Sequence, residues 1–68
     1  MELIINHHTK QFDLPELTVQ QLVAIEHGAK LQGLAVAVNN IVVPQSQWAT
    51  TYCHHRDNVL IITATQGG

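Results

Sequence analysis

Asn58-Val59-Leu60-Ile61-Ile62-Thr63-Ala64-Thr65 is a run of β-branched and aliphatic residues, the composition of a strand inside a sheet. Because successive side chains of a strand point to opposite faces, Val59 and Ile61 share one face, which we expect to form the core. Leu60 and Ile62 then share the opposite face. An apolar strand face on a small protein needs a cover, so we expect this second face to meet a partner.

The amino-terminal segment has the pattern of a β-hairpin. Residues 2–6 form a short β-type run, and residues 6–10 are polar enough to reverse the chain. Residues 11–14 then return as a second strand, which Pro15 ends because proline has no backbone N–H to donate.

A second hairpin is predicted nearer the middle of the chain. Residues 34–38 and 41–43 are its strands, and Asn39-Asn40 between them tolerate the positive φ values of a tight turn. In the first of these strands, larger aliphatic residues alternate with alanines. The pattern predicts a core face of Leu34, Val36 and Val38, and an opposite face of small residues, Ala35 and Ala37.

A helix is predicted between the two hairpins, over residues 18–27. Thr18 stands three residues before Gln21, the spacing at which the two side chains satisfy each other's backbone donors. Gly28 supplies a left-handed stop. The buried stripe expected at helical spacing consists of Val19, Leu22, Val23 and Ile25.

The remaining segment, residues 45–56, shows no sustained periodicity, and we expect a short helical turn and a loop there. Trp48 is expected to cover one edge of the core, because no second aromatic residue is spaced to join it in a ligand site. Asp57-Asn58 predicts a turn before the last strand.

The predicted order of elements is therefore β-β-α-β-β-β. Two hairpins separated by a helix, with the last strand between them and parallel to the first, form the ubiquitin-like β-grasp arrangement. This is an α+β fold in which a mixed sheet of four to five strands packs on one helix. We expect residues 1–65 to form this single domain and residues 66–68 to form a flexible tail.

Composition excludes several classes of protein. With 68 residues the chain forms one domain with a compact core. A net charge of −2 and three basic residues are too little positive charge to bind a run of phosphates, so we expect no nucleic-acid partner. The apolar runs are far shorter than the roughly 18 residues that a membrane-spanning helix needs. A single cysteine and the lack of a signal-peptide pattern lead us to expect a cytoplasmic protein without membrane contact.

The chain ends in Gln66-Gly67-Gly68, directly after the apolar strand. Without a Cβ on either glycine, such an end is thin enough to enter a narrow tunnel in a partner enzyme. The reactive group would then be the α-carboxylate of Gly68, with Gly67 providing clearance. Diglycine ends also occur as incidental flexible residues, so this signal depends on the sequence that precedes it.

A family resemblance is carried by the second hairpin together with Trp48, Asp57 and the diglycine end. The hairpin sequence is Ala35-Val36-Ala37-Val38-Asn39-Asn40-Ile41-Val42-Val43-Pro44. This combination resembles the ThiS family, the ubiquitin-like sulfur carrier proteins of thiamine thiazole biosynthesis. Two positions depart from the family pattern. Gln45 stands where a basic residue is common, and Gln66 stands where alanine is common, so details of partner contact differ.

The resemblance implies that Gly68 is adenylated by an E1-like, ATP-dependent enzyme of the ThiF type and converted to a thiocarboxylate. A persulfide-bearing protein would donate the sulfur, and a thiazole synthase of the ThiG type would take it. The carrier is then a co-substrate and not an enzyme; it binds no cofactor itself, since ATP and magnesium are held by the adenylating partner. The residues expected to contact partners are Leu60, Ile62, Ala35, Ala37 and Gln66.

Two alternatives use the same fold. The small subunit of molybdopterin synthase is a β-grasp sulfur carrier with the same ending, and the pattern from Val38 to Trp48 favours the thiazole branch over it. A ubiquitin-like interaction module with an incidental diglycine end is the other alternative. Loss of Gly67 and Gly68 would leave the function of such a module unchanged.

The histidines and the cysteine are expected to be ordinary residues. His7-His8 and His54-His55 are adjacent pairs, and neighbours in sequence point apart on a strand, so neither pair forms a metal chelate and no metal site is expected. A lone thiol at Cys53 could relay a persulfide, but an ordinary, partly buried cysteine is the preferred interpretation.

Overall fold

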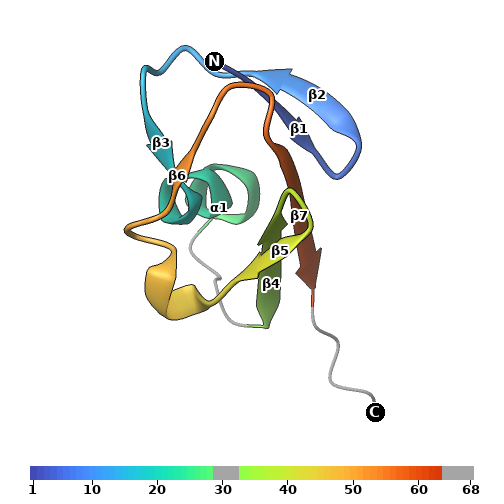
Figure 1. Ribbon diagram of the computed structural model, residues 1–68, viewed down its shortest axis with the longest axis vertical. Coiled ribbons are helices and arrows are strands. Elements are labelled where there is room, and N and C mark those ends of the chain that lie inside the picture. The colour runs from blue at the N-terminus through green and yellow to red at the C-terminus, as the bar shows by residue number, and fades with distance from the viewer. Residues whose placement is uncertain (29–32, 64–68) are drawn as a thin grey trace.

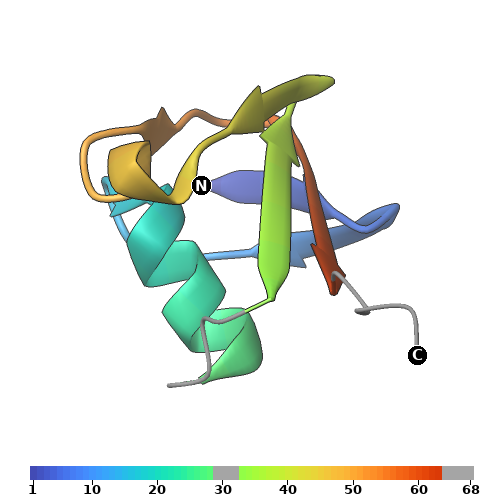
Figure 2. The ribbon, with the colours of Figure 1, turned by 90° about the horizontal axis from the view of Figure 1, so that it is seen from below.

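The computed structural model describes residues 1–28 and 33–63. A five-stranded mixed sheet with strand order β2-β1-β7-β4-β5 curves around the single helix α1, which lies against one face (Figures 1 and 2). A small second sheet pairs β3 with β6. The elements are β1 (Glu2–Ile5), β2 (His8–Gln11), β3 (Leu17–Thr18), α1 (Val19–His27), β4 (Leu34–Val38), β5 (Ile41–Val43), the 3-10 helix η1 (Gln45–Gln47), β6 (Tyr52–Cys53) and β7 (Asn58–Thr63).

Strand β7 is the central strand, as its apolar composition predicts. It runs parallel to β1, with Ile5 opposite Val59, and antiparallel to β4, with Val36 opposite Ile61. The last strand thus lies between the two hairpins and parallel to the first, which confirms the β-grasp topology. Val59 and Ile61 are buried in the core, as expected.

The first hairpin differs from its prediction. Its second strand is β2, residues 8–11, and the expected strand over residues 11–14 is wrong. The turn consists of Asn6 and His7 alone, with φ values of 50° and 68°. Two residues of positive φ match the natural twist of a hairpin, so the chain reverses earlier than the polar stretch suggests.

Helix α1 begins and ends where the capping signals place it. The backbone N–H of Gln21 donates to Thr18 Oγ1 over 3.1 Å, the Gln21 side chain accepts from the Thr18 N–H over 2.9 Å, and Gly28 follows the helix at φ 73°. The expected burial of Ile25 is wrong, because its side chain is 54% exposed. The buried residues of the helix are Val19, Leu22 and Val23.

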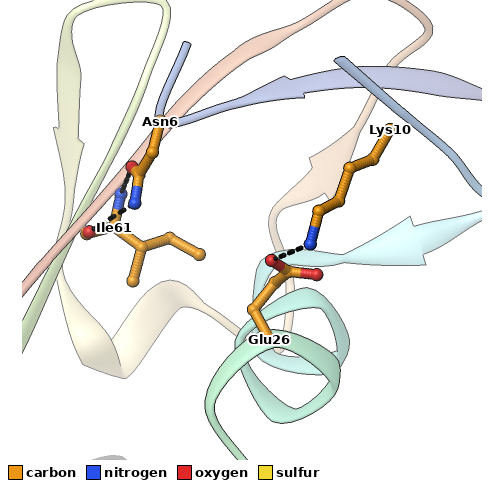
Figure 3. Close-up of polar contacts among 4 residues, drawn as sticks. All are labelled: Asn6, Lys10, Glu26 and Ile61. Carbon is orange, nitrogen blue, oxygen red and sulfur yellow. Dashed lines mark hydrogen bonds and ion pairs between the residues drawn. The ribbon is translucent and has the colours of Figure 1, made fainter. Parts of the chain in front are cut away.

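Helical spacing continues the buried stripe to Glu26 instead of Ile25. The Glu26 carboxylate meets the ammonium group of Lys10, which reaches over from β2, at 2.8 Å (Figure 3). The buried stripe of the helix therefore ends in the ion pair of Glu26 with Lys10, and not in the aliphatic side chain of Ile25 that the sequence pattern suggested.

The segment 45–56 holds the expected helical turn, η1, and one strand that we did not expect. Strand β6 pairs antiparallel with β3, placing Leu17 opposite Cys53. The turn expected at Asp57-Asn58 lies earlier, at residues 55–56, and Asn58 already belongs to β7. The Asp57 carboxylate stabilises this turn by accepting a hydrogen bond from the His54 N–H over 2.7 Å.

Trp48 is a core residue and does not merely cover an edge. Its side chain is 2% exposed, and its Nε1–H donates to the backbone carbonyl of Val43 over 2.8 Å. Of the expected core face of β4, Val36 is fully buried, while Leu34 and Val38 are partly buried and pack against the core. The buried apolar residues are Leu3, Ile5, Leu17, Val19, Leu22, Val23, Val36, Val43, Trp48, Cys53, Val59 and Ile61.

Candidate functional site

The face of the sheet turned away from α1 carries the predicted partner-contact residues. In the register of β4 and β7, Ala35 lies opposite Ile62 and Ala37 opposite Leu60. Directly paired residues of neighbouring strands point to the same face, so these four side chains form one patch. Ile62 is 56% exposed, Leu60 is half-buried, and the alanines add little bulk over β4.

Strand β5 adds Val42 to this patch, a residue that sequence reasoning missed. Val42 lies opposite Ala37 in the β4–β5 hairpin and is 70% exposed. A two-residue turn at Asn39-Asn40 fixes the register of the flanking strands, so the turn signal itself could have identified Val42. We refer to Ala35, Ala37, Val42, Leu60 and Ile62 as the outer face.

Toward β1 the outer face continues with Ile4, which lies opposite Asn58 of β7, and polar residues follow beyond it. Glu2 and Gln11 are a directly opposed pair at that side, and the Gln11 amide donates to the Glu2 carboxylate over 3.0 Å. The Glu2 carboxylate also lies 3.9 Å from the Arg56 guanidinium. An apolar centre with a polar border is typical of surfaces that bind other proteins.

The predicted partner-contact residue Gln66 lies outside the described residues, as do the predicted reactive end, Gly67 and Gly68, and the predicted domain boundary at residue 65. Strand β7 is described to Thr63, and Ile62 of the outer face immediately precedes this residue. The outer face is therefore close in sequence to the predicted reactive end. The assignment of a carrier role to Gly68 remains a prediction.

Cys53 lies on β6 and is buried, in agreement with the preferred interpretation. Burial, together with the nearby negative charge of Asp57, raises the pKa of its thiol from 9.0 to about 11. A thiol is nucleophilic only as the thiolate, so Cys53 stays unreactive at neutral pH. Around it is a half-open cavity of about 440 Å³, lined by Met1, Pro15, Glu16, Tyr52, Cys53, His54 and His55.

Of the two histidine pairs, His54-His55 makes local polar contacts. His54 Nδ1 lies 3.6 Å from the Asp57 carboxylate, and His55 Nδ1 accepts a hydrogen bond from the Glu2 N–H over 3.1 Å. His7 is part of the first hairpin turn. Within residues 1–28 and 33–63, no three His, Cys, Asp or Glu side chains are grouped so that they could hold a metal ion.

Helix α1 has nine residues, and no helix in the described part of the chain has the length and apolar character to cross a membrane.

Comparisons with known proteins agree with the fold and with the sequence pattern. The model of the ThiS family matches residues 3–68. A crystal structure of a thiamine biosynthesis protein (ThiS) from Geobacter metallireducens superposes with a TM-score of 0.87 at 23% identity, with all of both chains covered. A solution NMR structure of a thiamine biosynthesis protein from the same organism gives a TM-score of 0.81 at 23% identity, covering 100% of this chain and 88% of that one. No curated protein matches the sequence.

Proposed function

This chain belongs to the ThiS family, and on that premise we propose that it is a sulfur carrier protein of thiamine biosynthesis whose terminal glycine bears the sulfur. The observation that carries the proposal is the family match over residues 3–68, which includes the diglycine end as well as the folded domain. The similar structures from Geobacter metallireducens, both of thiamine biosynthesis proteins, support the same pathway.

The chemistry begins at the α-carboxylate of Gly68. Its pKa of roughly 3.3–3.7 keeps it ionised at neutral pH, and an ionised carboxylate is a poor electrophile. An E1-like enzyme that holds ATP and magnesium would transfer AMP to this carboxylate and release pyrophosphate. The carbon atom of the resulting mixed anhydride then has AMP as a good leaving group.

Sulfur would enter in two balanced steps. The terminal sulfur of a protein persulfide attacks the activated carbon, AMP leaves, and an acyl disulfide forms between carrier and donor. A thiol then reduces the sulfur–sulfur bond and is itself oxidised to a disulfide, which frees the thiocarboxylate of Gly68. A thiazole synthase would take the sulfur from this group.

The carrier's own contribution to these steps is binding and positioning. The outer face supplies an apolar surface for the adenylating enzyme and the thiazole synthase, with Ile62 and Val42 as its exposed large side chains. Gly67 leaves the chain thin where it enters the partner's active site. Docking of a folded domain beside the active site makes the reaction of the terminal carboxylate effectively intramolecular.

The proposal is tested by mass spectrometry of the carrier after incubation with an E1-like adenylating enzyme, ATP, magnesium and a persulfide donor. We expect the mass to rise by the difference between sulfur and oxygen, with the change located on Gly68. A chain extended by one alanine past Gly68 is the matched control and should gain no sulfur. Absence of the product from the unaltered chain would overturn the proposal.

The thiazole branch is tested by the identity of the acceptor. We expect the thiocarboxylate form to bind thiazole synthase and to lose its sulfur in the presence of that enzyme. Binding to the large subunit of molybdopterin synthase instead would assign the carrier to the other branch. A function that persists after deletion of Gly67 and Gly68 would identify an interaction module.

A further inference from the structure

Strand β7 has a neighbouring strand on both sides only over its first part. On one side β4 pairs with it as far as Thr63. On the other side β1 pairs with it only up to Ile5 and Val59, after which the N–H of Asn6 donates to the Val59 carbonyl over 2.9 Å. The chain then turns away at Asn6-His7. Beyond Val59, β1 can offer β7 no further backbone partner.

At Ile61 the side chain of Asn6 supplies the hydrogen-bond partners that the backbone of β1 no longer provides (Figure 3). Its Oδ1 accepts a hydrogen bond from the Ile61 N–H over 2.8 Å, and its Nδ2 donates to the Ile61 carbonyl over 3.2 Å. A residue of a neighbouring strand would offer the same donor and acceptor. The carboxamide therefore extends the β1–β7 pairing by one step beyond the end of β1.

Asparagine meets both requirements of this position. The contact needs a donor and an acceptor on one short planar group, which the carboxamide has and the aspartate carboxylate does not. The backbone φ of 50° is one that asparagine adopts more readily than most other non-glycine residues. Glycine would satisfy the turn but leave both Ile61 groups without this partner.

We infer that Asn6 is a positioning residue for the carrier reaction, holding the end of β7, which carries Leu60 and Ile62 of the outer face, against β1. This inference rests on the proposed function. Ile61 lies between Leu60 and Ile62, two outer-face residues, and the chain leaves the described part of β7 two residues later.

A partner that docks on the outer face and reacts with Gly68 needs the outer face and the end of the chain in one fixed relative position. If the end of β7 opens, only the fraction of molecules with β7 closed binds productively, and the apparent affinity falls by that fraction.

The test compares three variants. Asn6→Gly keeps a backbone that accepts positive φ and removes the carboxamide, while Asn6→Asp keeps the turn and one acceptor oxygen but loses the donor. Asn40→Gly is the matched control, since Asn40 is a turn asparagine at φ 70° whose side chain makes no hydrogen bond with other described residues. Circular dichroism at the assay temperature establishes that each variant is folded.

Two readouts are needed, hydrogen exchange at the Ile61 amide and the kinetics of pyrophosphate release by an E1-like adenylating enzyme. For Asn6→Gly we expect Ile61 exchange to rise roughly five- to tenfold, the size expected for the loss of one hydrogen bond. We expect the KM for the carrier to rise by a smaller factor, about twofold, with kcat unchanged, because KM follows the fraction of molecules with β7 closed, whereas exchange follows the opening constant itself. Asn6→Asp should change both quantities in the same direction, and Asn40→Gly neither.

Each other outcome decides a separate question. Faster Ile61 exchange with an unchanged KM would overturn the positioning role, because Asn6 would then serve stability alone. Unchanged exchange at the Ile61 amide would show that the hydrogen bonds from Asn6 to Ile61 do not restrain β7. If Asn6→Gly does not fold, Asn6→Asp decides the same points. Failure of the unaltered chain to be adenylated would overturn the proposed function, and the positioning role with it.

Discussion

Ala37 on β4 and Leu60 on β7 lie directly opposite each other on the outer face, and Val42 on β5 lies opposite Ala37 on its other side. A small residue between two larger aliphatic ones makes a shallow apolar surface over three strands. Ile62, at the end of β7, is the exposed side chain of this surface nearest in sequence to the terminal glycines. This arrangement makes a direct test of docking possible.

Replacing Ile62 by lysine should weaken binding of the adenylating partner about tenfold or more, because an interface centre tolerates an added charge poorly. Ile25→Lys is the matched control: Ile25 is 54% exposed against 56% for Ile62, but it lies on α1, away from the outer face. Isothermal titration calorimetry gives both affinities. Equal loss of affinity in the two variants would contradict docking through the outer face.

Replacing Trp48 by phenylalanine should lower the free energy of unfolding by about 2–3 kcal/mol, since it removes one hydrogen bond and leaves a cavity in the core. The lost bond is the one from Trp48 Nε1–H to the Val43 carbonyl, at 2.8 Å. Urea denaturation followed by circular dichroism measures the change. Tyr52→Phe, at a 48% exposed ring, should shift stability by less than about 0.5 kcal/mol, and a similar loss in both variants would disagree with this account.

The buried thiol of Cys53 should make stability depend on pH in the alkaline range. The folded-state pKa is about 11, and the thiol of the unfolded chain ionises near the ordinary value of 9.0. The buried neutral thiol therefore makes its full contribution to the free energy of unfolding below pH 9. This contribution is lost as pH rises to 11, because the thiol ionises more easily in the unfolded chain. Urea denaturation under reducing conditions should show this loss in the wild-type chain and not in Cys53→Ala. Parallel pH profiles of the two chains would contradict it.

The ion pair between Lys10 and Glu26 should contribute little to stability. Its nitrogen–oxygen distance is 2.8 Å, but the Lys10 side chain is 49% exposed, so water and salt screen the attraction. A double-mutant cycle with Lys10→Gln and Glu26→Gln should give a coupling energy of at most about 1 kcal/mol at low salt. That coupling should shrink when the salt concentration is raised. A larger coupling that salt does not change would show that the pair is more strongly desolvated than its exposure indicates.

Much of the fold could be predicted from local patterns. The capping residues Thr18 and Gln21 placed the helix, Asn39-Asn40 placed the second hairpin, and the alternation in β4 and β7 assigned their two faces. These signals work because a cap, a positive φ or a period of two is a property of a few consecutive residues. The first turn was predicted too long, over residues 6–10, and in the structure it consists of Asn6 and His7 alone.

The other errors come from contacts between distant parts of the chain. Strand β6 exists because Cys53 lies opposite Leu17, and neither two-residue segment shows a strand pattern by itself. Ile25 is exposed because the helix turns Glu26 toward Lys10 of β2, a strand that the sequence pattern placed too late. Burial of Trp48 likewise depends on how the segment after β5 crosses the core.

The amino-acid sequence by itself determined the element order, the helix caps, the second hairpin and the two-faced central strand, and from these the fold class and the expected carrier family. Only the tertiary structure decided the register that places Leu60 opposite Ala37 and Ile62 opposite Ala35, the pairing of Cys53 with Leu17, and the reach of Asn6 across to Ile61. The physical reason is distance along the chain. Periodicity and turn chemistry act between near neighbours, whereas a hydrogen bond between residues 6 and 61 requires that β1 and β7 be paired in the sheet.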